Sequence, residues 1–187
     1  MAGSPRLPTL APAAYDEAQR EAARSFRETR GIDPFGPYEA LMHSPRLMLL
    51  AQSVGEYLRY HSGIGTTLSE LVILVVARHW SQDFEWHAHA PIAAKVGIAA
   101  DTIAAIRDGR RPPKMSDDEA LVYDFTTELH QFKRVSDATW SRAEQRFGKP
   151  AVVDLVGISG YYGFLAMQMN ACRYQPPGDD RLPRFPD

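Results

Sequence analysis

The sequence predicts an all-α protein with a single domain. Between residues 12 and 172, apolar side chains recur at helical spacing, start and stop signals for helices separate the segments, and no stretch alternates apolar and polar residues as a strand would. The length of 187 residues is enough for one sizeable core that needs no disulfide or structural metal. The domain is therefore expected to cover residues 1–187, with proline-rich, irregular arms at about 1–12 and 174–187.

The first half of the chain predicts five helices, at about 12–30, 38–42, from Ser44-Pro45 onward, 68–80 and 84–95. Gly31 ends the first helix, because glycine adopts the left-handed cap conformation without strain. Thr67 and Glu70 have the spacing of a capping box at the start of the most apolar helix. That helix is expected to be the buried centre, and a break at 81–83 leads to the next.

The second half predicts four more helices, at about 101–109, 116–132, 136–148 and 152–172. Asp101 is expected to cap the first of them, and Ser116 and Glu119 form a second capping box. Gly148 with Pro150 is expected to end the third. In the last helix, glycines recur every third residue, at Gly157, Gly160 and Gly163. This spacing predicts a close crossing with another helix.

Composition and charge argue against several classes of protein. The 21 basic and 23 acidic residues give a net charge of −2, which predicts neither nucleic-acid nor membrane binding. The longest apolar run, 71–77, is far shorter than a membrane span, so a cytoplasmic location is expected. The single cysteine, Cys172, excludes an internal disulfide, a Cys-x-x-Cys redox pair and a thiolate zinc site.

The candidate catalytic residues lie on two consecutive helices. Gln82, Glu85 and His89 are spaced by three and then four residues, so they share one helix stripe, while His87 points away. A carboxylate one turn before an imidazole orients it for general acid–base work, and Glu70 on the preceding helix could join them. Two other interpretations stay open: a solvated i,i+4 surface pair, and a capping role for Glu70.

Segments 68–78 and 84–93 resemble the core signature of the carboxymuconolactone decarboxylase family, which also includes the alkylhydroperoxidase D-like proteins. The peroxidase branch of that family has a Glu, eleven residues, a Cys, two residues, a Cys, three residues and a His. Here the Glu and His fall on Glu70 and His89, but Gln82 and Glu85 occupy the two cysteine positions. The chain therefore resembles the cysteine-less, decarboxylase-type branch.

The resemblance implies an alkylhydroperoxidase D-like helical bundle that acts on a small carboxylated lactone or oxo acid, by decarboxylation or proton transfer, without cofactor or metal. It implies that His89 carries the proton or stabilises the oxyanion, and that Glu85 orients His89 or acts as an acid. It also implies that Glu70, supported by Gln82, completes the set of polar residues at the site. Arg78 is the cation expected to pair with a substrate carboxylate. The resemblance also implies a homo-oligomer, a trimer or hexamer.

Aromatic residues and histidines leave further alternatives. Four aromatic side chains could line the substrate pocket or belong to the core: Trp80, Trp86, Tyr161 and Tyr162. His87 and His89 lie on nearly opposite helix faces, so a shared metal ion is not expected. His130, near a helix C-terminus, is explained by the helix dipole. Two rival functions remain: a non-catalytic helical oligomer that binds a small ligand, and peroxide reduction through Cys172 with an external thiol.

Overall fold

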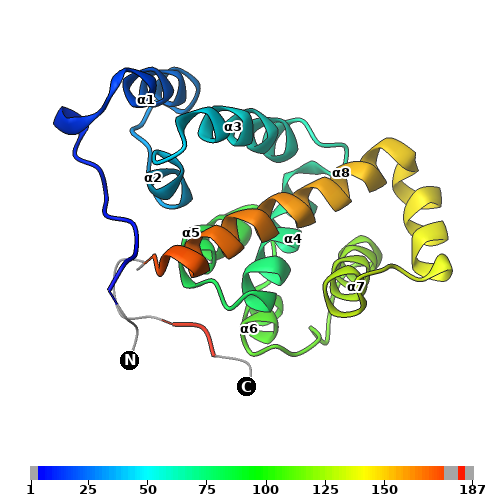
Figure 1. The fold of residues 1–187 in the computed structure, drawn as a ribbon. Coiled ribbons are helices and arrows are strands. Elements are labelled where there is room, and N and C mark those ends of the chain that lie inside the picture. The colour runs from blue at the N-terminus through cyan, green and yellow to red at the C-terminus, as the bar shows by residue number, and fades with distance from the viewer. Residues whose placement is uncertain (1–3, 175–180, 184–187) are drawn as a thin grey trace.

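The computed structural model describes residues 4–174 and 181–183, which form helices and no strand (Figure 1). A 3-10 turn, Pro12–Ala14, precedes the α-helices, whose bounds are α1 (Glu17–Arg30), α2 (Pro37–Leu41), α3 (Pro45–Tyr60), α4 (Gly65–His79), α5 (Asp83–Lys95), α6 (Ala100–Arg107), α7 (Asp117–Phe132) and α8 (Asp137–Cys172). The all-α prediction and the approximate position of every predicted helix are confirmed.

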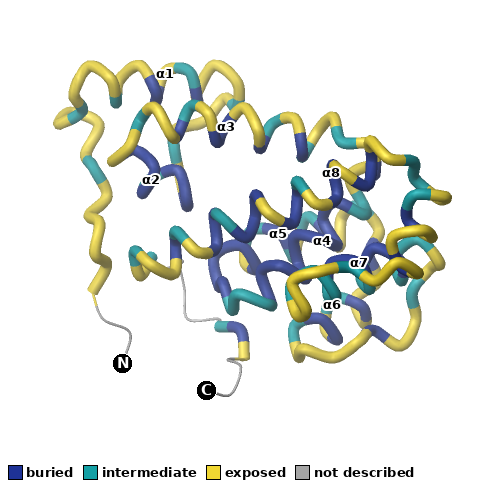
Figure 2. Tube along the Cα trace, turned by 45° about the vertical axis from the view of Figure 1, so that its right-hand side comes forward, coloured by how far each residue is buried: buried dark blue, intermediate teal, exposed yellow. Residues whose placement is uncertain are grey.

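Helix α4 is the centre of the core. Every residue from Ser69 to Arg78 on it is buried, and it packs against α5, α7 and α8. Figure 2 shows the buried residues concentrated on α4, α5 and the inner side of α8, whereas α1 and α3 expose their outer faces. The run of apolar residues in α4 is thus explained by burial on all sides.

Two predicted helix starts are wrong. Helix α1 begins after Asp16, not at Pro12, because Asp16 and Gln19 form a reciprocal capping box. Helix α4 begins at Gly65, and the predicted capping box of Thr67 and Glu70 does not form, since the Thr67 hydroxyl donates to the Val96 carbonyl at 3.0 Å. Glu70 is consequently one turn inside a buried helix and available for another contact.

Other start and stop signals act as predicted. Gly31 adopts the left-handed conformation after α1, and Ser116 and Glu119 form their capping box at the start of α7. Gly148 has φ 80° and interrupts α8, so the predicted division of that segment into two helices is confirmed. Asp101, however, lies in the first turn of α6, whose N-cap is Ala99.

Within the described residues, α8 is the one helix long and apolar enough to cross a membrane by length and composition, with a mean hydropathy of 1.3 over its best window. In that window, 61% of the residues are buried inside the protein. Such burial is typical of the core helix of a globular fold.

The described parts of both arms lie against the chain itself. The Arg6 backbone N–H donates to the Cys172 carbonyl at 2.8 Å, next to the end of α8. Leu182 is buried, and its backbone N–H donates to the Asp83 carboxylate at the start of α5 at 2.8 Å. The remaining arm positions, 1–3, 175–180 and 184–187, lie outside the described residues.

Helices α3 and α8 cross closely through glycines. A Cβ at Gly157 would approach Leu58 to 2.9 Å, and one at Gly55 would overlap the Tyr161 hydroxyl. A Cβ at Gly160 would meet no atom within 4 Å. The crossing predicted from the glycine pattern is therefore present at Gly157, while its partner glycine, Gly55, lies on α3.

We expect Gly55→Ala to destabilise the fold and to displace Tyr161. Overpacking a tight contact typically costs about 1–3 kcal/mol. The matched variant is Gly160→Ala, which adds a methyl group to an exposed helix position and should be neutral or stabilising by up to about 1 kcal/mol. Urea unfolding of both variants measures the difference, and equal effects would show that the α3–α8 contact is not tight at Gly55.

Candidate active site

A cavity of about 220 Å³ lies between helices α2, α3, α5 and α8, with the end of α1 at its edge. Its polar lining combines acidic, basic, imidazole and phenol groups, and six of these residues matter here: Arg30, Tyr38, Arg59, Glu85, His89 and Tyr161. Apolar side chains such as Phe84, Ile92 and Leu165 complete the wall. An apolar cavity with a few converging polar groups is the usual form of a small-molecule site.

His89 joins two buried carboxylates on neighbouring helices. Its Nδ1 lies 2.7 Å from Glu70 Oε2, and its Nε2 lies 3.5 Å from Glu85 Oε2. The side chains of all three residues are less than a tenth exposed. With the Glu70 carboxylate as acceptor, Nδ1 carries the hydrogen and donates it, which leaves the Nε2 lone pair facing Glu85.

The break between α4 and α5 brings these groups together. The Gln82 side-chain oxygen caps α5 by accepting from the backbone N–H groups of Phe84 and Glu85, at 2.7 and 3.4 Å. Helix α5 therefore starts close to the end of α4 and runs back beside it, so His89 reaches Glu70 on the first turns of α4. His87 is exposed on the other side of α5, as the spacing predicts.

Glu85 is poised to exchange a proton near neutral pH. Burial raises the pKa of its carboxyl group to about 7, while the neighbouring His89 and Arg59 act to lower it. Repulsion from Glu70 makes only a small contribution in the upward direction. Desolvation, rather than repulsion between the two carboxylates, is therefore the main cause of the raised pKa of Glu85.

Arg59 places a positive charge beside the buried carboxylates of the cavity. Its guanidinium lies 3.9 Å from Glu70 Oε1 and its side chain is 22% exposed, so it links the buried acids to the opening. The sequence had pointed to Arg78 for this role, but Arg78 lies elsewhere, between α4, α6 and α7. No signal in the sequence identifies Arg59, because a basic residue in the last turn of a helix is explained by the dipole.

A hydrogen-bonded chain of phenols forms another wall. Arg30 Nη2 donates to the Tyr38 hydroxyl at 3.1 Å, and the Tyr38 and Tyr161 hydroxyls lie 2.8 Å apart. Burial raises the pKa of both tyrosines above its ordinary value, so both hydroxyls stay protonated. Tyr162 stands edge-on to the His89 ring, with the ring centroids 5.2 Å apart.

The structure brings Glu85, His89 and Tyr161 to the cavity, with Glu70 directly behind His89. Gln82 is buried below it, where its amide nitrogen donates to Asn170 at 2.9 Å, so it positions α5 and does not line the cavity. Trp86 is part of the hydrophobic core and likewise does not line it. Tyr38, Arg30 and Arg59 are polar lining groups that the sequence analysis missed.

Comparison with known proteins identifies the fold. No family model and no curated protein matches the chain. Among solved structures, it resembles an uncharacterized peroxidase-related protein from Silicibacter sp. TM1040, with a TM-score of 0.75, 13% identity and coverage of 92% of this chain and 91% of that one.

A second structure, the alkylhydroperoxidase AhpD core of an uncharacterized peroxidase-related protein from Ralstonia eutropha JMP134, matches with a TM-score of 0.71, 18% identity and 92% coverage of both chains. The fold is therefore that of the alkylhydroperoxidase D-like helical proteins.

Proposed function

We propose that this protein is a cysteine-independent enzyme of the carboxymuconolactone decarboxylase type. Its substrate is a small carboxylated lactone or related oxo acid, on which it performs decarboxylation or proton transfer without a cofactor. The observation that supports this best is the buried series Glu70, His89 and Glu85 beside a cavity, with the pKa of Glu85 raised to about 7. Groups that titrate near the working pH are the effective general acids and bases.

The residues divide into three roles in such a reaction. Arg59 attracts the substrate carboxylate, whose bond to carbon breaks as carbon dioxide leaves. The electron pair moves onto the carbonyl oxygen as an enolate, which the protonated phenol of Tyr161 stabilises by donating a hydrogen bond. Glu85 then returns its proton to carbon, and His89, held by Glu70, takes up a proton from water at Nε2 and passes it to Glu85.

The test is a screen of carboxylated lactones and 3-oxo acids without added metal or thiol. Product formation is followed by ultraviolet absorbance, and carbon dioxide release by a coupled assay. Turnover of any of these compounds supports the proposal. Saturable binding without turnover would instead favour the non-catalytic ligand-binding protein, and neither binding nor turnover would contradict both.

The matched structures are described as peroxidase-related, which makes a thiol reaction the natural rival. Here both positions of the redox pair lack cysteine, and Cys172 is not among the residues that line the cavity. Burial also raises the pKa of its thiol, which lowers the fraction of reactive thiolate.

We therefore expect Cys172→Ser to leave the turnover of an identified substrate unchanged, and wild-type protein to show no thiol-dependent peroxide reduction. Peroxide consumption is measured with dithiothreitol as reductant. Robust consumption that disappears in Cys172→Ser would restore the peroxidase interpretation.

We also propose that the protein assembles into a homo-oligomer, a trimer or hexamer, and that it is cytoplasmic. Self-association is favoured by exposed apolar side chains on α3 and α8, including Leu50 at 61% and Val153 at 64% exposure.

A further inference from the structure

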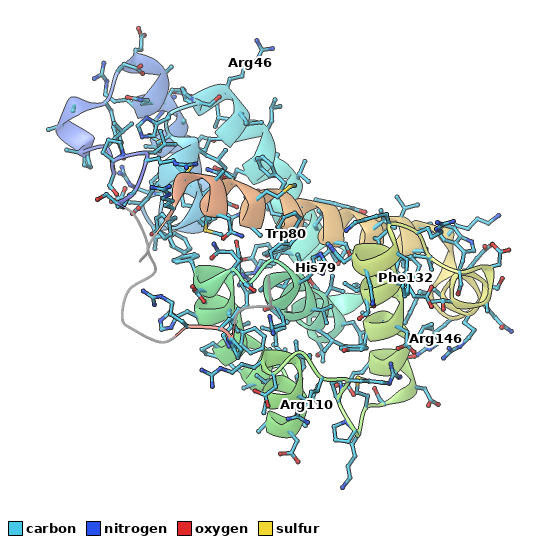
Figure 3. The ribbon with its side chains drawn as sticks, turned by 60° about the horizontal axis from the view of Figure 1, so that its bottom comes forward. Arg46, His79, Trp80, Arg110, Phe132 and Arg146 are labelled. Atoms are coloured by element: carbon cyan, nitrogen blue, oxygen red, sulfur yellow. The ribbon has the colours of Figure 1, made fainter. Side chains whose placement is uncertain are left out.

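Three polar side chains of the cavity wall form a hydrogen-bonded chain across three helices. Arg30 is the last residue of α1, Tyr38 lies on α2 and Tyr161 lies on α8. Figure 3 shows α1, α2 and α3 together on one side of α8, where Arg46 is labelled, and α6 and α7 on the other side, with Arg110. The proposed reaction uses the Tyr161 hydroxyl and gives the other two side chains of the chain no role.

The Arg30 guanidinium is held by two aromatic rings and one hydroxyl group. Its central carbon lies 5.2 Å from the ring centroid of Phe26 and 5.1 Å from that of Tyr38, within the range of cation–π contacts. Its Nη2 donates to the Tyr38 hydroxyl at 3.1 Å. The two rings also pack together, with centroids 4.7 Å apart. The guanidinium is therefore fixed against Tyr38.

A guanidinium can only donate hydrogen bonds, and this sets the direction of the chain. Because the Tyr38 oxygen accepts from Arg30, the Tyr38 hydrogen needs an acceptor of its own, and the Tyr161 oxygen lies 2.8 Å away. Tyr38 is 5% exposed, and a buried hydroxyl that leaves its hydrogen unpaired is costly. Tyr38 therefore donates to Tyr161, and the Tyr161 hydrogen remains for an acceptor in the cavity that both phenols line.

The environment of the two phenols favours the same direction. Burial raises the pKa of both, but Arg30 and the bond with Tyr161 act to lower the pKa of Tyr38. The bond with Tyr38 acts to raise the pKa of Tyr161. Tyr38 is thus the more acidic phenol and the stronger donor of the pair. Each bond in an aligned chain also polarises the next, which carries the effect of the Arg30 charge to the Tyr161 hydroxyl.

The Tyr161 hydroxyl lies directly against the backbone of α3, because Gly55 has no side chain there. Tyr38 and this backbone together hold its oxygen in place. We propose that Arg30 and Tyr38 are positioning residues that turn the Tyr161 hydroxyl toward an oxyanion bound in the cavity. The inference rests on the proposed function, in which that oxyanion is the enolate. A donor fixed before the charge develops stabilises the transition state more than it stabilises the substrate.

Pentafluorophenolate is the probe for this inference, because its oxyanion is conjugated to a ring as an enolate is to its double bond. Its counterpart without the oxygen is pentafluorobenzene. At about pH 6.5 the probe is largely ionised, while Glu85, with a pKa of about 7, still largely holds its proton. The affinity of the full chain for each compound is measured by fluorine NMR. Wild-type protein should bind the phenolate saturably, and failure to bind it would overturn the inference.

Two conservative variants test the donor and the residue that directs it. Tyr161→Phe should lower the affinity for pentafluorophenolate about tenfold or more, and Tyr38→Phe at least about threefold. Both variants keep their aromatic ring, so the affinity for pentafluorobenzene should not change. A merely structural role of these residues would weaken the binding of both compounds alike. Equal losses for the two compounds, or an unchanged phenolate affinity in Tyr38→Phe, would overturn the inference.

The role of Arg30 is tested in two backgrounds. Arg30→Met should lower the phenolate affinity at least about threefold in wild type but less than about twofold in Tyr38→Phe, because the charge acts through that hydroxyl. An undiminished loss in the Tyr38→Phe background would show a direct effect of the charge and overturn the inference. Arg24→Met removes an exposed guanidinium from the same helix and should change neither affinity. Circular dichroism checks the fold, and if Arg30→Met does not fold, Tyr38→Phe alone decides.

These measurements need no turnover, so they are independent of the screen for the proposed reaction. A phenolate affinity that depends on Arg30 and Tyr38, in a protein that converts no lactone or oxo acid, would support the directed donor and contradict the reaction. Conversion of such a compound by a protein whose phenolate affinity is independent of both residues would overturn the inference and leave the proposed function standing.

Discussion

Replacing His89 with alanine is expected to lower turnover of an identified substrate by about 100-fold or more. Removing a general acid–base group typically costs about 10²–10⁴ in rate. His89 links the two buried carboxyl groups, since it lies 2.7 Å from Glu70 and 3.5 Å from Glu85. Without it, Glu85 loses the group that replaces its proton after each turnover.

The matched control is His87→Ala, which removes an exposed imidazole from the same helix and should change the rate little. His89→Ala also leaves the buried Glu70 carboxylate without its donor, which costs stability. His89→Asn keeps an amide donor for Glu70 and carries no exchangeable acid–base group, so it should fold and remain inactive. Equal rate losses in His87→Ala and His89→Asn would contradict the assignment of the catalytic face.

Local signals predicted most of the helix boundaries correctly, because they depend on neighbours in sequence. Gly31, Ser116 and Gly148 each act within one helical turn, and each ends or starts a helix where expected. The capping box of Thr67 and Glu70 failed because tertiary contacts compete for both side chains. Their partners, Val96 and His89, are 29 and 19 residues away in the chain.

The same difference between local signals and tertiary contacts explains which residues of the candidate site the sequence could predict. The stripe of Glu85 and His89 follows from helical spacing, so the sequence could predict it. The position of Arg59 depends on how α3 packs beside α4, which no local pattern encodes. Arg78 and Arg59 both lie near helix C-termini, and only the packing of α6 and α7 over Arg78 separates their roles.

Replacing Glu85 with glutamine is expected to stabilise the protein at alkaline pH by as much as about 3 kcal/mol. The pKa of this carboxyl is raised by burial from 4.5 to about 7, and each tenfold change in proton affinity corresponds to 1.36 kcal/mol. Between pH 4.5 and 7 the native state binds more protons at Glu85 than the unfolded state does. The contribution of Glu85 to stability therefore falls as the pH rises through this interval and is constant above about pH 8.

Glutamine cannot ionise, so the difference in the free energy of unfolding between variant and wild type should grow from pH 5 to pH 8 and then level off. Urea unfolding at a series of pH values measures that difference, and subtraction removes the titration of all other groups. Glu28→Gln, at an exposed position on α1, is the matched control and should show no such growth. A flat difference for Glu85→Gln would mean that the carboxyl ionises in the native state as easily as in water. Glu85 could then not hold a proton for catalysis near neutral pH, and the proton would have to come from His89.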